Sequence, residues 1–239
     1  LVFTQDVEFT HEIMLWIALA TMFVGVIGAA AQNETRKILS FHIISQIGYM
    51  VLGLALFTPL GLMGAVFYLL HHIIVKANLF LIAGVANRLT GSYRLDRSGG
   101  LYKAHPWLAA LFLIPAFSLA GFPPLSGFWA KYIVVEGSLR AEAWFTAGIA
   151  LLVGLLTIYS MVKIWIAVFW TPHPEGEGAV RPFSSIEGRW ALIAPILTMA
   201  AMTVLIGLMV EPALAFSERA AQQLLDPSAY VAAVLGASR

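Results

Sequence analysis

Cysteine is absent from this sequence of 239 residues, and charged residues are scarce. The absence of cysteine excludes disulfide bonds, thiolate metal sites and cysteine nucleophiles. Charged residues account for 11% of the chain and hydrophobic residues for 60%, with a mean hydropathy of +0.84. A water-soluble protein of this length needs a more polar surface, so the composition predicts an integral membrane protein.

Motifs for nucleotide-driven or redox chemistry are also missing. The sequence has no GxxxxGK[ST] phosphate loop and no haem-attachment motif. The adjacent His71 and His72 diverge around a helix, which makes them a weak metal signal. We therefore expect no cofactor, no metal and no enzymatic reaction, and a net charge of +1 gives no indication of nucleic acid. The chain begins with Leu1 and shows no signal-peptide pattern, so we interpret it as a fragment or a processed chain.

What the sequence does contain is long apolar runs. A transmembrane helix needs about 20 largely apolar residues, and runs this long without alternation favour a helical bundle over a barrel. The predicted fold is all-α and membrane-integral, with an external segment at 1–11, a bundle at 12–210 and an external or interfacial tail at 211–239. The expected spans are 12–31, 38–57, 60–87, 107–135, 143–170 and 190–210.

Basic residues are distributed unequally between alternate connections. The second and fourth connections and the tail carry only Arg140, Arg219 and Arg239. The first, third and fifth connections carry Arg36, Lys37, Arg88, Arg94, Arg97, Lys103, Arg181 and Arg189. Because cytoplasmic loops are enriched in Lys and Arg, this bias predicts that the first, third and fifth connections are cytoplasmic.

The third expected span contains ionisable residues near its middle. Tyr68, His72 and Lys76 follow one another at i, i+4 spacing and therefore share one helical face. A charge at this depth costs about 2.5–3.5 kcal/mol or more, so such residues usually have a function. No Asp or Glu lies inside spans two to four to pair with Lys76. We predict a proton-carrying role for Lys76 and His72, with Tyr68 and His71 as possible members of the path; the alternative is a structural lysine paired outside this chain.

The second expected span has its own polar stripe. His42, Gln46 and Tyr49 share a face, and Ser45 flanks it. Hydrogen bonding between helices would explain the stripe. The alternative is a route that admits protons from the cytoplasm to Lys76 through His42, with Gln46 as a possible member.

The fourth expected span is interrupted at LAGFPPLSGFWAKY, residues 119–132. We expect Gly121, Pro123, Pro124 and Gly127 to break the helix, because each proline lacks an N–H donor and clashes with the preceding turn. Broken helices at membrane depth often mark ion sites in transporters. Lys131 follows the break, and we predict that it carries protons; the alternative is a lysine that extends to the outer headgroups.

Lys163, seven residues before the end of the fifth span, is close enough to that end for its amine to reach the headgroups. We therefore predict a structural role for it. The buried lysines and histidines differ from Lys163, because a desolvated lysine gives up its proton readily and histidine titrates near neutrality. A series of such groups can pass protons without redox chemistry.

Three segments carry a resemblance to a known family. ETRKILSFHIISQIGYM (34–50), HHIIVKANLFLIAG (71–84) and AGFPPLSGFWAKY (120–132) resemble signature regions of the antiporter-like membrane subunits of respiratory complex I, membrane-bound hydrogenases and Mrp-type Na+/H+ antiporters. The tail FSERAAQQLLDPSAYVAAVLG (216–236) is similar to that of the Mrp D subunit.

The resemblance implies the C-terminal half of a fourteen-helix subunit in a bacterial cytoplasmic membrane, with other membrane subunits as partners. Lys76 and Lys131 match the family's central lysine and its broken-helix lysine, and His72 matches a histidine one turn before the central lysine. Tyr68 stands where some relatives carry another histidine, which puts a strict relay through that position in doubt.

Three functions are compatible with the sequence. The first is a proton-translocating subunit of a multisubunit Na+/H+ antiporter. The second is a proton-pumping subunit of a complex I-like NADH-quinone oxidoreductase or a membrane-bound hydrogenase. The third is a structural membrane subunit, which the buried lysines and the broken helix disfavour. The first two use the same residues, so the sequence of this chain does not separate them.

Overall fold

The computed structural model describes residues 7–186, 188–226 and 228–236, and its regular elements are helices. The long helices are α1 (Val7–Ala31), α2 (Thr35–Leu56), α3 (Pro59–Thr90), α5 (Pro106–Ala120), α6 (Ser126–Arg140), α7 (Trp144–Trp165), α8 (Arg189–Leu208) and α9 (Glu211–Leu225). Shorter helices are α4 (Leu101–Ala104) and α10 (Ser228–Leu235), and a wide π-helical turn, Ile166–Trp170, extends α7. The predicted all-α class is confirmed.

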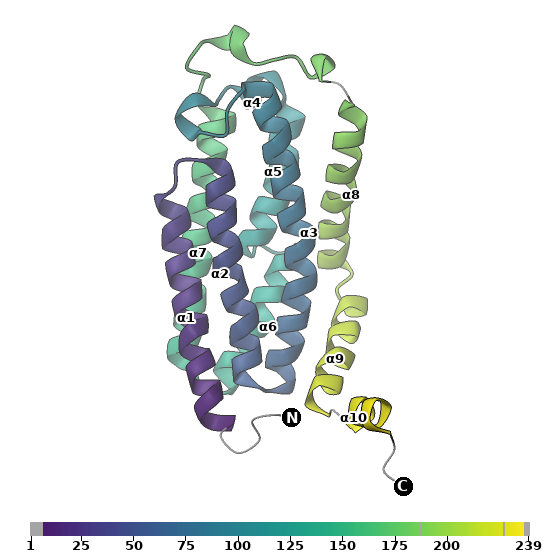
Figure 1. The fold of residues 1–239 in the computed structure, drawn as a ribbon. Coiled ribbons are helices and arrows are strands. Elements are labelled where there is room, and N and C mark those ends of the chain that lie inside the picture. The colour runs from purple at the N-terminus through teal and green to yellow at the C-terminus, as the bar shows by residue number, and fades with distance from the viewer. Residues whose placement is uncertain (1–6, 187, 227, 237–239) are drawn as a thin grey trace.

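The helices run up and down in a bundle, and α3 lies at its centre (Figure 1). This helix packs against α2, α5, α6, α8 and α9. The α1–α2, α3–α4 and α7–α8 connections meet at one end of the bundle, whereas the α2–α3 and α6–α7 connections lie at the other (Figure 1). Successive connections therefore lie at alternate ends of the bundle, as the predicted orientation requires. Which end faces the cytoplasm stays a prediction.

The ends of α2 and α3 are defined by local chemistry. Thr58 caps α3 by accepting a hydrogen bond from the Gly61 backbone N–H at 3.0 Å, and Pro59 occupies the first turn, where its missing N–H costs nothing. At the other end of α3, Gly91 adopts φ +79°, a left-handed conformation that glycine accepts without strain. These signals place the turn at Thr58–Pro59, between the second and third expected spans.

The described residues contain five helices that are long and apolar enough to cross a membrane. They correspond to the first, second, third, fifth and sixth expected spans, with ends shifted by a few residues. The first helix begins at Val7, so residues 7–11 of the expected external segment are helical; residues 1–6 lie outside the described part.

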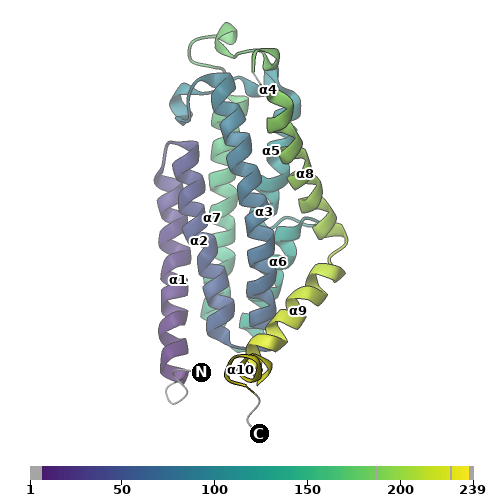
Figure 2. The ribbon, with the colours of Figure 1, turned by 45° about the vertical axis from the view of Figure 1, so that its right-hand side comes forward.

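The fourth expected span is divided into α5 and α6, as the prolines predict. Helix α5 ends at Ala120, and the next residue, Gly121, adopts φ +98°. Residues 121–125 form an irregular linker about midway along the bundle (Figure 2). One part of the prediction is wrong, because Gly127 lies in the first turn of α6 and does not break it. The reason for glycine there is a close approach: an added Cβ would lie 1.7 Å from the Ser118 carbonyl oxygen of α5.

The chain after residue 210 is also more ordered than a simple interfacial tail. Helix α9 packs along α3 and runs at an angle to α8, from which a bend at Met209–Val210 separates it (Figure 2). Pro212 occupies the first turn of α9, where proline is favoured, and it cannot continue α8 as a regular helix. The position of this segment relative to headgroups stays a prediction.

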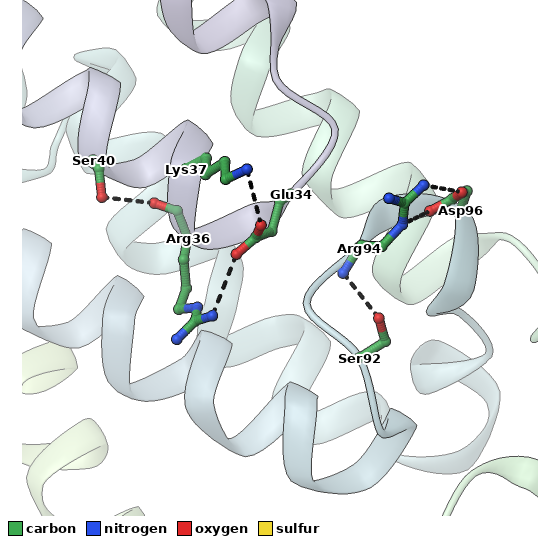
Figure 3. A network of polar contacts seen from close by, with 7 residues as sticks. All are labelled: Glu34, Arg36, Lys37, Ser40, Ser92, Arg94 and Asp96. Carbon is green, nitrogen blue, oxygen red and sulfur yellow. Dashed lines mark hydrogen bonds and ion pairs between the residues drawn. The ribbon is translucent and has the colours of Figure 1, made fainter.

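Loops at one end of the bundle are joined by main-chain hydrogen bonds and ion pairs. The Thr35 N–H donates to the Tyr93 carbonyl at 2.9 Å, and the Leu95 N–H donates to the Asn33 carbonyl at 3.0 Å. Figure 3 shows the side chains around these contacts. Glu34 lies between Arg36 and Lys37, whereas Arg94 pairs with Asp96 at 2.7 Å. The basic residues of these connections are therefore partly neutralised by local carboxylates.

Candidate proton path in the bundle

A set of polar side chains lies buried where α2, α3, α5 and α6 pack together. Its members come from four helices and are His42, Gln46, Tyr49, Tyr68, His71, His72, Lys76, Ser118 and Ser126. Ser45 of α2 is also buried, but it faces α1, where its hydroxyl donates to the Met22 carbonyl at 2.8 Å. Lys131 of α6 reaches the same region from beside the break. Every site residue predicted in the second and third spans therefore lies in the interior, away from solvent.

Lys76 is held by a main-chain carbonyl. The residue is 5% exposed, and its Nζ donates to the Leu39 carbonyl of α2 at 3.0 Å. Leu39 lies one turn before His42 on the same helix, so the amine sits on the side of α2 that carries the polar stripe. No ion pair to Lys76 occurs among the described residues, in agreement with the absence of acidic residues from spans two to four.

Lys131 bends back toward the break. Its Nζ donates to the Ala120 carbonyl, at the end of α5, at 3.1 Å, and it lies 5.3 Å from the centre of the Tyr49 ring. That distance is within the range of a cation–π contact. The stem of Lys131 passes over Gly121, where an added Cβ would lie 2.9 Å from Lys131 Cδ. The amine therefore points into the bundle, which counts against the alternative of a lysine extended to the outer headgroups.

Aromatic and amide groups connect Lys131 to α2 and α3. The rings of Tyr49 and Tyr68 stack with centroids 5.1 Å apart, and the Tyr68 hydroxyl donates to Gln46 Oε1. The Tyr49 hydroxyl donates to the Ala150 carbonyl of α7. Two possible path members, Tyr68 and Gln46, are thus in direct contact with one another.

His71 occupies a more central position than its spacing indicates. Its Nδ1 lies 2.8 Å from Ser126 Oγ, and Ser126 Oγ lies 3.1 Å from Ser118 Oγ. Ser118 also accepts the Gly127 backbone N–H at 3.1 Å. The chain His71–Ser126–Ser118 therefore joins α3 to both sides of the α5–α6 break. His71 and His72 diverge around α3, as the helical spacing predicts, and His71 lies on the side that meets the break.

Several buried ring nitrogens make no hydrogen bond within the described part of the chain. They are both nitrogens of His42 and Nε2 of His71 and of His72. Buried polar atoms in proteins almost always have a partner, and water commonly supplies it. Histidines in this situation can accept and release protons without first breaking a protein hydrogen bond.

A groove of about 280 Å³ reaches Lys131 from the side of the bundle. It lies between α5, α6 and α7, and its lining is apolar apart from Lys131 and Tyr132. No cluster of three metal-ligating His, Cys, Asp or Glu side chains occurs among the residues that the structure describes. The ionisable side chains of the interior are lysines and histidines, which are residue types that can accept and release protons.

Lys163 has a different environment. Its Nζ donates to the Ala30 carbonyl at 2.9 Å and to the Gln32 carbonyl at 2.7 Å, at the C-terminal end of α1. The last carbonyls of a helix lack intrahelical donors and carry partial negative charge, which a lysine stabilises. The contact supports the structural interpretation, although the amine caps a helix instead of extending to headgroups.

Sequence reasoning missed Ser118, Ser126 and Asn78. The two serines flank the proline pair, and this position beside the expected break is the signal that could have identified them. Asn78 is fully buried with neither amide atom bonded to a described residue, and only its position two residues after Lys76 singles it out.

Residues 1–157 match a protein family described as NADH:quinone oxidoreductase/Mrp antiporter, TM. The chain is 46% identical to a Na+/H+ antiporter D subunit from Alkalihalophilus pseudofirmus over 98% of this chain and 47% of the relative. It is 39% identical to the corresponding D subunit from Bacillus subtilis, with the same shares covered. The chain therefore spans about half the length of the curated relatives it matches.

Solved structures show the same fold. A chain of the Mrp complex from Dietzia sp. superposes with a TM-score of 0.85 and 37% identity, covering 95% of this chain and 49% of that one. A chain of respiratory complex I from Thermus thermophilus superposes with a TM-score of 0.76 and 26% identity, covering 92% and 46%. Both of these chains belong to larger assemblies.

Proposed function

Because this chain belongs to the NADH:quinone oxidoreductase/Mrp antiporter transmembrane family, we propose that it forms the proton-translocating half of a subunit in a multisubunit antiporter that exchanges Na+ for H+. The names of the Alkalihalophilus and Bacillus relatives support the cation and the reaction. The Dietzia complex supports other membrane subunits as partners. The proposed location is the bacterial cytoplasmic membrane.

The observation that carries the proposal is the position of Lys131. Its amine bonds to the carbonyl that ends α5, beside an interruption about midway along the bundle. A main-chain carbonyl attracts a protonated amine without neutralising it, so the proton can leave again. Broken backbone at membrane depth is retained where it lines a site. A carboxylate would instead stabilise the charged form of the amine and hold the proton.

The proposed path uses the residues predicted from the sequence and one link from the structure. Protons reach His42 from the cytoplasmic end and pass to Lys76, which is bonded to the same helix at Leu39. His72 and His71 lie on α3 between Lys76 and the break, and the Ser126–Ser118 pair continues from His71 toward Lys131. The hydrogen bond from the Tyr68 hydroxyl to Gln46 orients the Tyr68 ring, which stacks on Tyr49 beside Lys131. Water joins the unbonded ring nitrogens.

A second function shares these residues. The similarity to a complex I chain supports a proton pump driven by electron transfer in other subunits. In that case the interior would carry protons by the same groups, and the energy would come from partners. The response to external Na+ separates the two functions, because only an antiporter couples proton movement directly to the cation.

The test uses everted membrane vesicles from an antiporter-deficient host that expresses the complete complex. Respiration acidifies the vesicle interior, a pH-sensitive dye follows it, and Na+ is then added. We expect Na+ to discharge the gradient, and Lys131→Ala to reduce this response to the background of the host. Lys37→Ala is the matched control, because Lys37 is an exposed lysine at the end of the bundle.

Two results would contradict the proposal. Exchange at the unaltered rate in Lys131→Ala, with normal amounts of complex, would remove Lys131 from the path. A complete complex that gives no response to Na+, Li+ or K+ would favour the redox-driven pump.

A further inference from the structure

The end of α8 meets the interruption between α5 and α6 on the side of α6 that carries Trp129. This interruption is the 121–125 linker, and a second one lies between α8 and α9 at Met209–Val210 (Figure 2). Helix α8 packs on both α5 and α6. The contact joins residues about 80 positions apart in the sequence. The spacing of residues within one helix therefore does not predict it.

Gly207 allows this contact. An added Cβ at this position would lie 2.1 Å from the Pro124 carbonyl oxygen and 2.7 Å from backbone atoms of Leu125. These are main-chain atoms of the linker, so they could not move aside as the tip of a side chain can. Only glycine therefore lets the end of α8 lie directly against the linker.

A side-chain hydrogen bond fastens the same junction. The indole N–H of Trp129 donates to the Gly207 carbonyl at 3.0 Å. This carbonyl lies in the last turn of α8, where helical carbonyls lack intrahelical donors. Trp129 comes two residues before Lys131 on α6, so one end of α8 touches α6 at Trp129 and the linker at Pro124.

We propose that Trp129 and Gly207 are positioning residues, which lock α6 to the end of α8 and so hold the Lys131 amine on the Ala120 carbonyl. The Lys131 contact crosses the break, from α6 back to α5, and therefore depends on how the two half-helices are placed relative to one another. The linker itself contains no regular hydrogen-bond ladder to maintain that placement. Ser118 joins the two half-helices through Ser126 and the Gly127 N–H, and the end of α8 adds a second constraint, on the side of α6 that carries Trp129. This inference rests on the proposed function only for the role of Lys131.

The first measurement reports the junction without using transport. In a cysteine-free complete complex, Phe122→Cys places a thiol in the linker, at a residue that is 41% exposed. The rate of labelling by N-ethylmaleimide is then compared in Trp129→Phe and Gly207→Ala. We expect labelling to be about fivefold faster in Trp129→Phe, the factor that corresponds to loss of one net hydrogen bond. It should be at least as much faster in Gly207→Ala, because the added Cβ collides with the backbone of Pro124 and Leu125. Trp190→Phe and Gly148→Ala are the controls, because Trp190 is 71% exposed and nothing lies within 4 Å of a Cβ at Gly148.

The second measurement connects the junction to Lys131. Trp129→Phe, without the Cys substitution, is expected to lower Na+-driven exchange about fivefold and to displace its pH profile, because the carbonyl contact of the amine is loosened. Unchanged labelling in Trp129→Phe overturns the junction, and an unchanged pH profile overturns the positioning of Lys131. If Gly207→Ala prevents assembly of the complex, the labelling and exchange of Trp129→Phe test the proposal by themselves. If the unaltered complex shows no exchange while labelling still changes, the proposed function fails and the junction stands.

Discussion

The charged residues in the interior and those at the loop end of the bundle are stabilised in different ways. At the loop end, Glu34 and Asp96 accept the neighbouring cations in exposed ion pairs (Figure 3). In the interior, Lys76 and Lys131 bond to the carbonyls of Leu39 and Ala120, and no carboxylate pairs with them among the described residues.

The difference indicates where protons can move. An ion pair lowers the free energy of the charged form and keeps it charged, whereas a carbonyl compensates only part of the cost of burying an amine. Lys163 is intermediate, because it also bonds to carbonyls but lies at a helix end. If the comparison is correct, substitutions should have their largest effect on exchange in the interior and their smallest at the loop end.

The largest effect is expected at Lys76. Lys76→Ala should reduce Na+-driven exchange by more than about tenfold, because it removes the proposed proton carrier at the Leu39 carbonyl. A tenfold decrease in rate corresponds to about 1.4 kcal/mol in the activation free energy. Exchange in everted vesicles measures it, with the amount of complex determined by immunoblot. Lys37→Ala, at the exposed loop end, is the control. Retained exchange with normal assembly would show that the buried lysine is structural.

A smaller effect is expected at Ser126. Ser126→Ala removes the hydroxyl that joins His71 to Ser118, and we expect exchange to fall about fivefold, since one hydrogen-bonded link is lost while the lysines remain. The exchange rate as a function of pH measures this change. Ser40→Ala, an exposed serine of α2, is the control. Equal rates in both variants would exclude the serine bridge from the path.

Lys163→Ala should affect stability more than transport. The variant loses the amine that caps α1, and we expect a decrease of about 1 kcal/mol in stability with exchange largely retained. Thermal unfolding of the purified complex, followed by tryptophan fluorescence, measures the first quantity. Lys163→Arg should restore the stability. Loss of exchange in Lys163→Ala as complete as in Lys131→Ala would place Lys163 in the path.

The smallest effect is expected at Asp96. The Arg94 guanidinium bonds to this carboxylate and lowers its pKa, so the pair contributes stability above the ordinary titration range of Asp, and this contribution is lost as the pH falls through the lowered pKa. Asp96→Asn should therefore lower the unfolding temperature slightly at pH 7, and this difference should disappear as the pH falls below the lowered pKa of Asp96. Exposed pairs contribute little, so exchange should be unchanged. A difference that grows on acidification would contradict the assignment.

Much of this molecule follows from local patterns. The apolar runs predict the helices, and successive spans predict that alternate connections gather at one end of the bundle, as they do. The proline pair predicts the interruption between α5 and α6, and the scarcity of carboxylates predicts that Lys76 has no ion pair, as found among the described residues. These properties depend on side chains close together in the sequence, which is why no tertiary structure is needed to predict them.

Contacts between helices were decided only by the tertiary structure. Helical spacing places His72 and Lys76 on one face, but it does not indicate that His71 meets Ser126 across the break, or that Lys131 turns inward to Ala120. Gly127 was expected to break a helix and instead permits α6 to approach Ser118, and Gly207 does the same for α8 and the linker. The sequence by itself determines which residues lie on a helical face, because helix geometry is local. The rotation and depth of each helix, which decide what that face meets, result from the packing of all the helices together.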